Sequence, residues 1–277
     1  MTLQAAKNMS ELDVAAYLAR IGYRDERSAT LRTLRAIHLL HPTAITFENI
    51  DVLLKRPIRL ELPAIADKIM TRGRGGYCYE QNTLLMAALR ALDFSVRSVA
   101  GRIQWNMNGL VTARNHMVLL VSLPDGEYIA DVGFGGLTLT APLKLEPGLE
   151  QETPHGWYRI VRANDEFQLQ AKLDGQWSAM YQFALADEAP ADWEMANWFI
   201  ATSPDSIFTK ALILARPASD RRYALRNNRL RIHHADGSTE QRMIASSNEL
   251  FSVLRGEFNL KLPDHGELDA IAAVAGV

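Results

Sequence analysis

The spacing of the apolar residues changes near Phe94, and this change constrains the fold more than any other feature of the sequence. Before Phe94, apolar side chains recur at steps of three and four residues, which is the period of an amphipathic helix. After it come segments rich in β-branched and aromatic residues, separated by turn signals such as Pro124-Asp125-Gly126. This order predicts an α+β protein in which helices come first and an antiparallel sheet or small barrel follows.

Three helices are expected in the helical part. The first is capped by Ser10 and ends near Gly22, and the third begins just after Gly75-Gly76. The second ends at His41-Pro42, because proline disfavours helical backbone at the residue before it. The apolar faces of these helices are expected to form a common core.

The strand-rich part contains six expected strands, over residues 96–103, 117–123, 128–132, 157–163, 167–173 and 176–183. A proline-bearing stretch at 186–190 then marks a boundary. Beyond it we expect a helix at 193–200, a strand at 212–215, a hairpin over Asn227-Asn228 and a final helix at 247–255. The chain is therefore divided into a helical region at 1–92, a barrel at 93–190 and a mixed α/β region at 191–277.

The charge balance excludes several classes of function. Thirty Lys and Arg residues face 32 Asp and Glu residues, which gives a net charge of −2. A general nucleic-acid or membrane-surface binder needs a clear basic excess. The single cysteine excludes an internal disulfide, and the sequence lacks both a signal-peptide pattern and an apolar run of membrane-spanning length. We therefore expect a cytoplasmic protein, a monomer or a homodimer, with neither nucleic acid nor membrane as a partner.

The only thiol lies at a place suited to chemistry. Cys78 follows Gly75-Gly76 and starts the third expected helix. Glycines allow a tight turn, and the N-terminus of a helix favours a thiolate over a thiol through its unpaired N–H groups and its dipole. A thiolate is the reactive form of cysteine. The alternative interpretation is a buried cysteine that packs as a small apolar residue.

A hairpin downstream carries a base and an acid that fit such a nucleophile. His116 opens one expected strand, and Asp131 lies near the end of the next. With Pro124-Asp125 in the centre of the turn, residue 118 faces residue 131, which places His116 on the same face as Asp131 and diagonal to it. An aspartate that orients a histidine beside a cysteine forms a nucleophile–base–orienter triad. Taken singly, each residue is also compatible with an ordinary strand-edge histidine or a turn aspartate.

Several segments together resemble the arylamine N-acetyltransferase family, in the order in which that family has them. They are Thr46-Phe47-Glu48-Asn49-Ile50-Asp51, Arg74 to Asn82, Asn115-His116-Met117, Asp131-Val132-Gly133-Phe134-Gly135, Asn197-Trp198 and Ser203-Pro204-Asp205-Ser206-Ile207-Phe208. Arg-Gly-Gly-x-Cys together with Asp-Val-Gly-Phe-Gly makes the resemblance specific. Thr46 stands where the family usually has proline, and Asn115 stands where it often has a small hydroxyl residue.

The resemblance implies a fold of three parts: an N-terminal helical bundle, a central antiparallel β-barrel and a C-terminal α/β lid, around a cysteine-protease-like core. It implies that Cys78, His116 and Asp131 form the catalytic triad. It also implies acetyl-CoA as the donor and arylamines, arylhydrazines or N-hydroxyarylamines as acceptors, with no metal. The aromatic positions that line the acceptor pocket of the family match Phe47, Phe134 and Phe208.

The turn after Asp131 is a candidate contact for the coenzyme. Backbone N–H groups of Gly133, Gly135, Gly136 and Thr138 are suited to hold a phosphate or the pantetheine arm of CoA. The alternative is an ordinary turn at the end of a strand.

Nearby arginines have two interpretations each. Arg74 is expected either to pair with Glu48 and stabilise the cysteine loop or to remain solvated. A second group is expected either to meet CoA phosphates or to form a solvated strand face, and it comprises Arg221, Arg222, Arg226, Arg229 and Arg231.

Two histidine pairs, His38 with His41 and His233 with His234, have no Cys or Asp nearby at the spacing that metal ligands usually show. We interpret them as structural or exposed histidines rather than metal ligands.

Other activities share parts of this pattern. A cysteine hydrolase or transglutaminase-like protein uses the same triad chemistry, a related amide synthase transfers a longer acyl chain, and a catalytically silent CoA-binding module keeps only the coenzyme contacts. Acetyl transfer through an acetyl-cysteine, with ping-pong kinetics, is the leading hypothesis.

Overall fold

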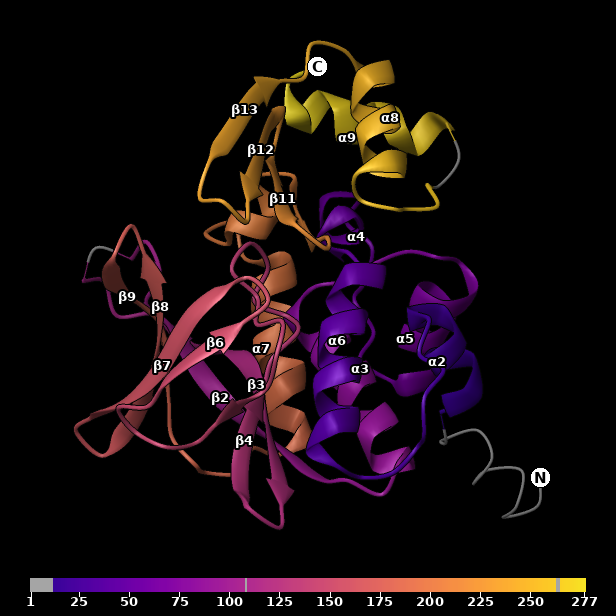
Figure 1. The fold of residues 1–277 in the computed structure, drawn as a ribbon. Coiled ribbons are helices and arrows are strands. Elements are labelled where there is room, and N and C mark those ends of the chain that lie inside the picture. Colours follow the sequence, from indigo (N-terminus) through magenta and orange to yellow (C-terminus); the bar gives the residue numbers. More distant parts are fainter. Residues whose placement is uncertain (1–11, 108, 263–264) are drawn as a thin grey trace, which may run out of the picture.

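The computed structural model describes residues 12–107, 109–262 and 265–277 of the 277-residue protein, and these form an α+β fold of three parts (Figure 1). The first part is helical. The second is a nearly closed antiparallel β-barrel, and the third packs helices on a small antiparallel sheet. The three-part architecture expected from the sequence is thus present.

The helical part is built from α2 (Val14–Ile21), α3 (Leu31–Ala44), α5 (Leu62–Ala66), a π-helical turn η1 (Asp67–Thr71) and α6 (Cys78–Ala91). The expected cap Ser10 lies outside the described residues. The Asp13 side chain accepts the Ala16 N–H at 3.0 Å and caps α2, which ends at Gly22 in the left-handed conformation.

The expected end of the second helix at His41-Pro42 is wrong, because α3 continues to Ala44. Pro42 lies in the last turn, where its missing N–H costs only one hydrogen bond. The Thr43 hydroxyl donates to the Leu39 and Leu40 carbonyls, and the Ile45 N–H donates to the His41 carbonyl. The Leu39, Leu40 and His41 carbonyls around the proline therefore have donors.

The barrel contains the six expected strands and two short ones. Its strands are β2 (Ser95–Ile103), β3 (Arg114–Leu123), β4 (Gly126–Ala130), β5 (Leu143–Lys144), β6 (Glu150–Thr153), β7 (Gly156–Ala163), β8 (Glu166–Leu173) and β9 (Gln176–Phe183), in the spatial order β5-β4-β3-β2-β9-β8-β7-β6. Leu119 faces Ala130, which confirms the expected register of the β3–β4 hairpin. The third expected strand, however, ends at Ala130 rather than at residue 132.

The third part is assembled from distant pieces of the chain. After α7 (Pro190–Thr202) and a short 3-10 turn η2 (Ile207–Thr209) come β10 (Ile213–Pro217), β11 (Arg221–Arg226), β12 (Arg229–His234), β13 (Thr239–Met243), α8 (Ser247–Gly256) and α9 (His265–Ala275). The edge strand of its sheet is β1 (Phe47–Glu48), where Phe47 pairs with Ala215, and α4 (Ile50–Leu53) follows β1. The division at residues 92 and 190 stays a prediction, and β1 belongs to the sheet of the last part.

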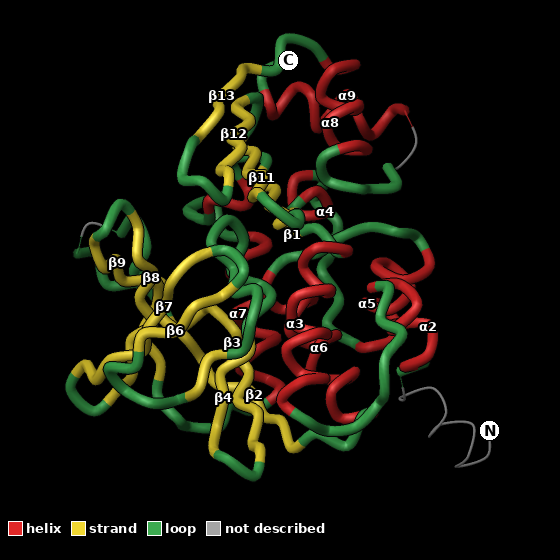
Figure 2. Tube along the Cα trace, viewed as in Figure 1, coloured by secondary structure: helices red, strands yellow, loops and turns green. Residues whose placement is uncertain are grey.

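A continuous apolar core joins the helices to the barrel. Leu84, Leu85 and Leu89 of α6 belong to the same buried cluster as Met117 and Leu119 of β3. Helix α6 lies against β2 and β3, and α7 also contacts β3 (Figure 2). Burial of these side chains fixes the start of α6 relative to the β3–β4 hairpin.

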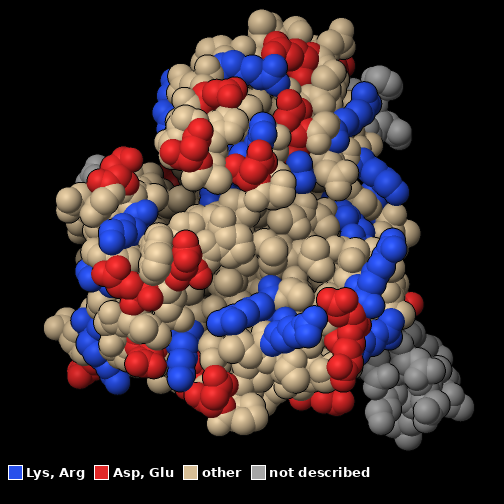
Figure 3. Space-filling view, in the orientation of Figure 1, with Lys and Arg blue, Asp and Glu red and all other residues tan. Residues whose placement is uncertain are grey.

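The surface agrees with the charge balance of the sequence. Basic and acidic side chains are interspersed over the face in Figure 3, and an uncharged area lies across its centre. Among the described residues, none of the helices has the length and apolarity that crossing a bilayer requires.

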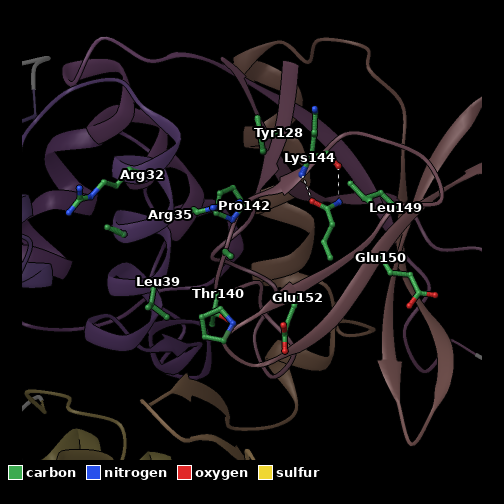
Figure 4. Close-up of a pocket in the computed structure, with 14 residues that line it drawn as sticks. Arg32, Arg35, Leu39, Tyr128, Thr140, Pro142, Lys144, Leu149, Glu150 and Glu152 are labelled. Atoms are coloured by element: carbon green, nitrogen blue, oxygen red, sulfur yellow. Dashed lines mark hydrogen bonds between the residues drawn. The ribbon is translucent and has the colours of Figure 1, made fainter. Parts of the chain in front are cut away.

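The seam of the barrel, where the end strands β5 and β6 meet, is closed by a side chain rather than by a strand ladder. The end strands β5 and β6 do not pair with each other. Instead, the Gln151 side chain accepts the Lys144 N–H at 2.8 Å and donates to the Lys144 carbonyl at 3.0 Å, as the dashed lines at Lys144 in Figure 4 mark. This amide imitates the two bonds that a neighbouring strand would make.

A buried arginine joins the third part to the barrel. Arg222 is 6% exposed, and its guanidinium donates to the Thr138 and His155 carbonyls and to the Tyr158 hydroxyl. Among the described residues it forms no ion pair. Arg222 is thus not part of a solvated strand face, whereas Arg231, on the adjacent strand, is exposed and bonds Gln241.

We predict that Arg222→Met lowers the free energy of unfolding by roughly 1–3 kcal/mol, because buried oxygen atoms lose their donor. Thermal and urea unfolding measure this loss. Arg231→Met is the matched control, and it is expected to change stability by less than about 0.5 kcal/mol. Equal effects of the two substitutions would contradict the role of Arg222 in joining the third part to the barrel.

Candidate active site

Cys78 is the first residue of α6 and is 5% exposed. The loop before it lies alongside β1: the Glu48 N–H donates to the Gly76 carbonyl at 3.0 Å, and the Gly76 N–H donates to the Thr46 carbonyl at 3.3 Å. The thiol is therefore held at a helix N-terminus by a fixed loop, as the sequence predicts. This position favours an anion.

His116 and Asp131 meet beside Cys78. The imidazole Nε2 of His116 lies 2.7 Å from Oδ2 of Asp131, and both residues are buried. Since Nε2 is bonded to the carboxylate, Nδ1 is the ring nitrogen left for the Cys78 thiol, which lies near His116 and contributes to raising its pKa. The structure thus brings the three residues singled out from the sequence together, with His116 bonded to Asp131 on one side and facing Cys78 on the other.

The Asp131 carboxylate is held from two further directions. Its Oδ1 accepts a bond from the Asn82 amide at 2.9 Å and one from the Gly133 N–H at 2.9 Å. The Asp131 N–H turns away from the strand and donates to Nε2 of His38 on α3 at 3.0 Å. This bond explains why β4 ends at Ala130.

The protonation states follow from these contacts. Burial works to lower the pKa of His116, but the Asp131 carboxylate and the contact with Cys78 raise that pKa to about 10. Burial works to raise the pKa of Asp131, yet His116, Asn82 and the Gly133 N–H hold that pKa below its usual range. A positive imidazolium beside an ionised aspartate is the state that stabilises a thiolate.

The two histidines of α3 are buried and structural, in line with the sequence interpretation. His41 lies between the Tyr17 hydroxyl and the Gln81 amide oxygen, with both contacts at 2.7 Å. Burial lowers the pKa of His38 to about 4 and that of His41 to about 3, so both rings are neutral. In the part of the chain that the structure describes, no three His, Cys, Asp or Glu residues are grouped to hold a metal.

On the other side of the cysteine loop lies a cluster of charged residues. Arg74 donates to the Glu48 carboxylate at 2.8 Å, which confirms the expected pairing. Lys68 contacts Asp51 and Glu80, at 2.8 Å each. Neighbouring cations hold the pKa of Asp51 at about 2 although burial opposes this.

Comparison with known proteins decides the family. A family model described as N-acetyltransferase matches residues 30–266. The arylamine N-acetyltransferase of Escherichia coli K12 is 39% identical over 262 residues, covering 93% of this chain and 93% of the relative. The chain belongs to the arylamine N-acetyltransferase family.

Solved structures of arylamine N-acetyltransferases share the whole fold. The enzyme of Mycobacterium marinum superposes with a TM-score of 0.91 at 38% identity, covering 95% of this chain and 100% of the other. A structure of the M. marinum enzyme in complex with CoA has a TM-score of 0.90 at 37% identity, covering 95% and 99% of the two chains.

Of the three phenylalanines that the family resemblance assigned to the acceptor pocket, one contacts a triad residue and the other two contact each other. The ring of Phe134 is 5.5 Å from that of His116, and the rings of Phe47 and Phe208 are 6.0 Å apart. Phe208 also contacts Tyr77, the residue before the nucleophile, at 5.8 Å. The role of these rings in binding an acceptor stays a prediction.

The turn at residues 133–138 contains an exposed residue as well as residues that are already hydrogen-bonded to Asp131. Gly136 is exposed, whereas the Gly133 N–H is bonded to Asp131. Thr138 is buried, and its hydroxyl donates to the Asp131 carbonyl at 3.2 Å. In this conformation Gly133 and Thr138 stabilise the turn and Gly135 is buried, so that Gly136 is the exposed candidate for contact with CoA, and the call on Gly135 stays a prediction.

A cavity of about 730 Å³ lies elsewhere, between α3 and the barrel seam. Arg32, Arg35 and Leu39 come from α3, and Lys144 and Glu152 are among the residues of the barrel side (Figure 4). The triad does not line this cavity, so it is not the reaction site.

The sequence analysis missed Asn82 and Glu80, which hold the site from α6. Asn82 follows Cys78 by four positions and therefore lies on the same face of the helix, which is a signal that was available. Glu80, at the third position of the helix, accepts the Tyr77 N–H at 3.0 Å and fits a capping pattern. His38 of α3, which accepts the Asp131 N–H, had no comparable signal in the sequence.

We predict that Gly133→Ala destabilises the fold by about 1–3 kcal/mol and also lowers reactivity at Cys78. A Cβ at this position would lie 2.7 Å from Cα of Cys78 and 2.9 Å from the Asn82 amide nitrogen. Thermal unfolding and cysteine alkylation measure the two effects. Gly136→Ala is the control for stability, since a Cβ there meets no atom within 4 Å. Equal melting temperatures of the two variants would show that the close approach of Gly133 to Cys78 and Asn82 does not matter for stability.

The raised pKa of His116 predicts a pH dependence of stability. The folded-state pKa of about 10 lies above the ordinary 6.5, so the folded state keeps a proton that the unfolded state loses. This contribution is complete below about pH 6.5 and is lost as the pH rises through about 10. Urea unfolding over this range should show a steeper loss for the wild type than for His116→Gln, and parallel slopes would refute the assignment.

Proposed function

We propose that this protein transfers an acetyl group from acetyl-CoA to the nitrogen of arylamines and arylhydrazines, and to the oxygen of N-hydroxyarylamines. The observation that carries the proposal is the His116–Asp131 hydrogen bond beside Cys78 at the start of α6, in a chain of this family. The M. marinum relative in complex with CoA supports the donor.

In the first half-reaction, the Cys78 thiolate attacks the thioester carbonyl of acetyl-CoA. The bond from the carbonyl carbon to the CoA sulfur breaks, and the leaving thiolate takes the proton of the His116 imidazolium. One thioester replaces another, so this exchange is nearly balanced in energy and the acetyl-enzyme accumulates.

In the second half-reaction, the amine attacks the acetyl group on Cys78. Neutral His116 takes the amine proton as the tetrahedral intermediate forms, and Asp131 stabilises the resulting imidazolium. The intermediate collapses with the Cys78 thiolate as the leaving group, which restores the starting charges. Arylamines are weak nucleophiles, so positioning between the aromatic rings of Phe134 and Phe208 contributes to the rate.

Binding of the two substrates is proposed at opposite parts of the site. Phe47, Phe134 and Phe208 hold the aromatic acceptor, and the backbone at Gly135 and Gly136 contacts CoA. A cytoplasmic location and a monomeric or homodimeric state stay predictions.

We predict that acetyl-CoA alone adds one acetyl group per chain, at Cys78, and that a subsequent arylamine removes it. Intact-mass and peptide mass spectrometry follow both steps. Cys78→Ser should remain unlabelled and Asp131→Asn should react at least about 10²-fold more slowly, because the imidazole loses its orienting anion.

The same experiment separates the alternatives. An acetyl-enzyme that water removes within seconds, with no effect of the amine, would support a hydrolase instead. Faster labelling by longer acyl-CoAs would support an amide synthase, and an unlabelled wild type would leave only a silent CoA-binding module.

A further inference from the structure

Lys68 is a buried cation at the junction of three elements near the nucleophile. It lies on η1, and its side chain is 7% exposed. Its ammonium group contacts Asp51 of α4 and Glu80 of α6 at 2.8 Å each, and Glu48 of β1 at 4.0 Å. Burial works to lower the pKa of Lys68, but these three carboxylates raise that pKa above its usual range. Lys68 is therefore charged.

Glu80 connects Lys68 to the residue before the nucleophile. Its Oε1 accepts from Lys68, and its Oε2 accepts from the Tyr77 N–H at 3.0 Å. The side chain folds back over Gly76, where an added Cβ would lie 2.7 Å from Oε2 of Glu80. A continuous path thus runs from Lys68 through Glu80 to the backbone that presents Cys78.

The charges near the start of α6 need this cation. Three carboxylates, of Glu48, Asp51 and Glu80, are met by Lys68 and Arg74, while Arg56 reaches Asp51 only from a partly exposed position at 3.5 Å. Without Lys68, Glu80 keeps only its bond to the Tyr77 N–H in the first turn. Burial already raises the pKa of Glu80. The other charged groups around the thiol, His116 and Asp131, come from the barrel side.

We propose that Lys68 is a positioning residue for Cys78: it holds Glu80 against the Tyr77 N–H and offsets the Glu80 charge, so that a thiolate forms beside a compensated carboxylate. The inference rests on the proposed role of Cys78 as nucleophile. A buried ion pair is often no more stabilising than a neutral pair of the same shape. The benefit of the charge is therefore expected in reactivity rather than in stability.

The test compares Lys68→Gln, Glu80→Gln and the double variant by the rate of carbamidomethylation of Cys78, the single cysteine, as a function of pH. Lys68→Gln should move the profile up by about one pH unit, which slows the reaction up to about tenfold on the acidic limb of the profile. Glu80→Gln should move it down, because an anion is removed while the amide oxygen still accepts the Tyr77 N–H. The double variant should return close to the wild-type profile.

The controls separate charge from shape. Lys68→Arg keeps the charge and should retain the wild-type profile, and Lys172→Gln makes the same chemical change on the half-exposed face of β8. Circular dichroism and thermal midpoints report folding. If Lys68→Gln does not fold, the direction of the Glu80→Gln shift still decides, since an upward shift overturns the proposal.

Two further results would overturn the proposal. A Lys68→Gln profile that coincides with the wild type would do so, as would a double variant no faster than Lys68→Gln. A wild-type Cys78 that resists alkylation altogether marks instead the failure of the proposed function.

Discussion

The arrangement of the molecule depends on one buried carboxylate. Asp131 is completely buried, and an ionised group there is tolerable only with partners on every side. Those partners come from different parts of the chain: His116 from β3, Asn82 from α6, Gly133 from the following turn and, at the backbone, His38 from α3. Satisfying this charge fixes the barrel relative to the helices.

The start of α6 is where these constraints meet. Three neighbouring side chains on this helix each bond to a different part of the molecule. Glu80 contacts Lys68, Gln81 donates to the Thr46 and Gly76 carbonyls and bonds His41, and Asn82 contacts Asp131. Cys78 is thereby placed by polar contacts from both flanks, while the apolar side chains farther along α6 pack on the barrel. The nucleophile therefore belongs to a helical turn that is held by side-chain hydrogen bonds to several parts of the protein.

Local patterns account for the sequence predictions that succeeded, and several of the features that were missed depend on non-local contacts. Apolar periodicity located the main helices and strands, and the Pro124-Asp125 turn fixed the register that places His116 near Asp131. The pairing of β1 with β10 had no signal, because a two-residue strand has no periodicity and its partner is far away in the chain. Helix α9 did have one, in the apolar spacing of Leu268, Ile271 and Ala275, but it was overlooked. The support of Asp131 by α3 was invisible, because it joins a side chain to a distant backbone N–H.

The amide of Gln151 at the barrel seam has a consequence for how this architecture tolerates change. Two hydrogen bonds from one side chain hold β5 to β6, whereas the strands that carry His116 and lead to Asp131 are joined by full ladders. A change in the length of the segment between β5 and β6 therefore leaves those ladders intact. We expect the seam to be where homologous chains accommodate insertions, leaving the reacting groups in place.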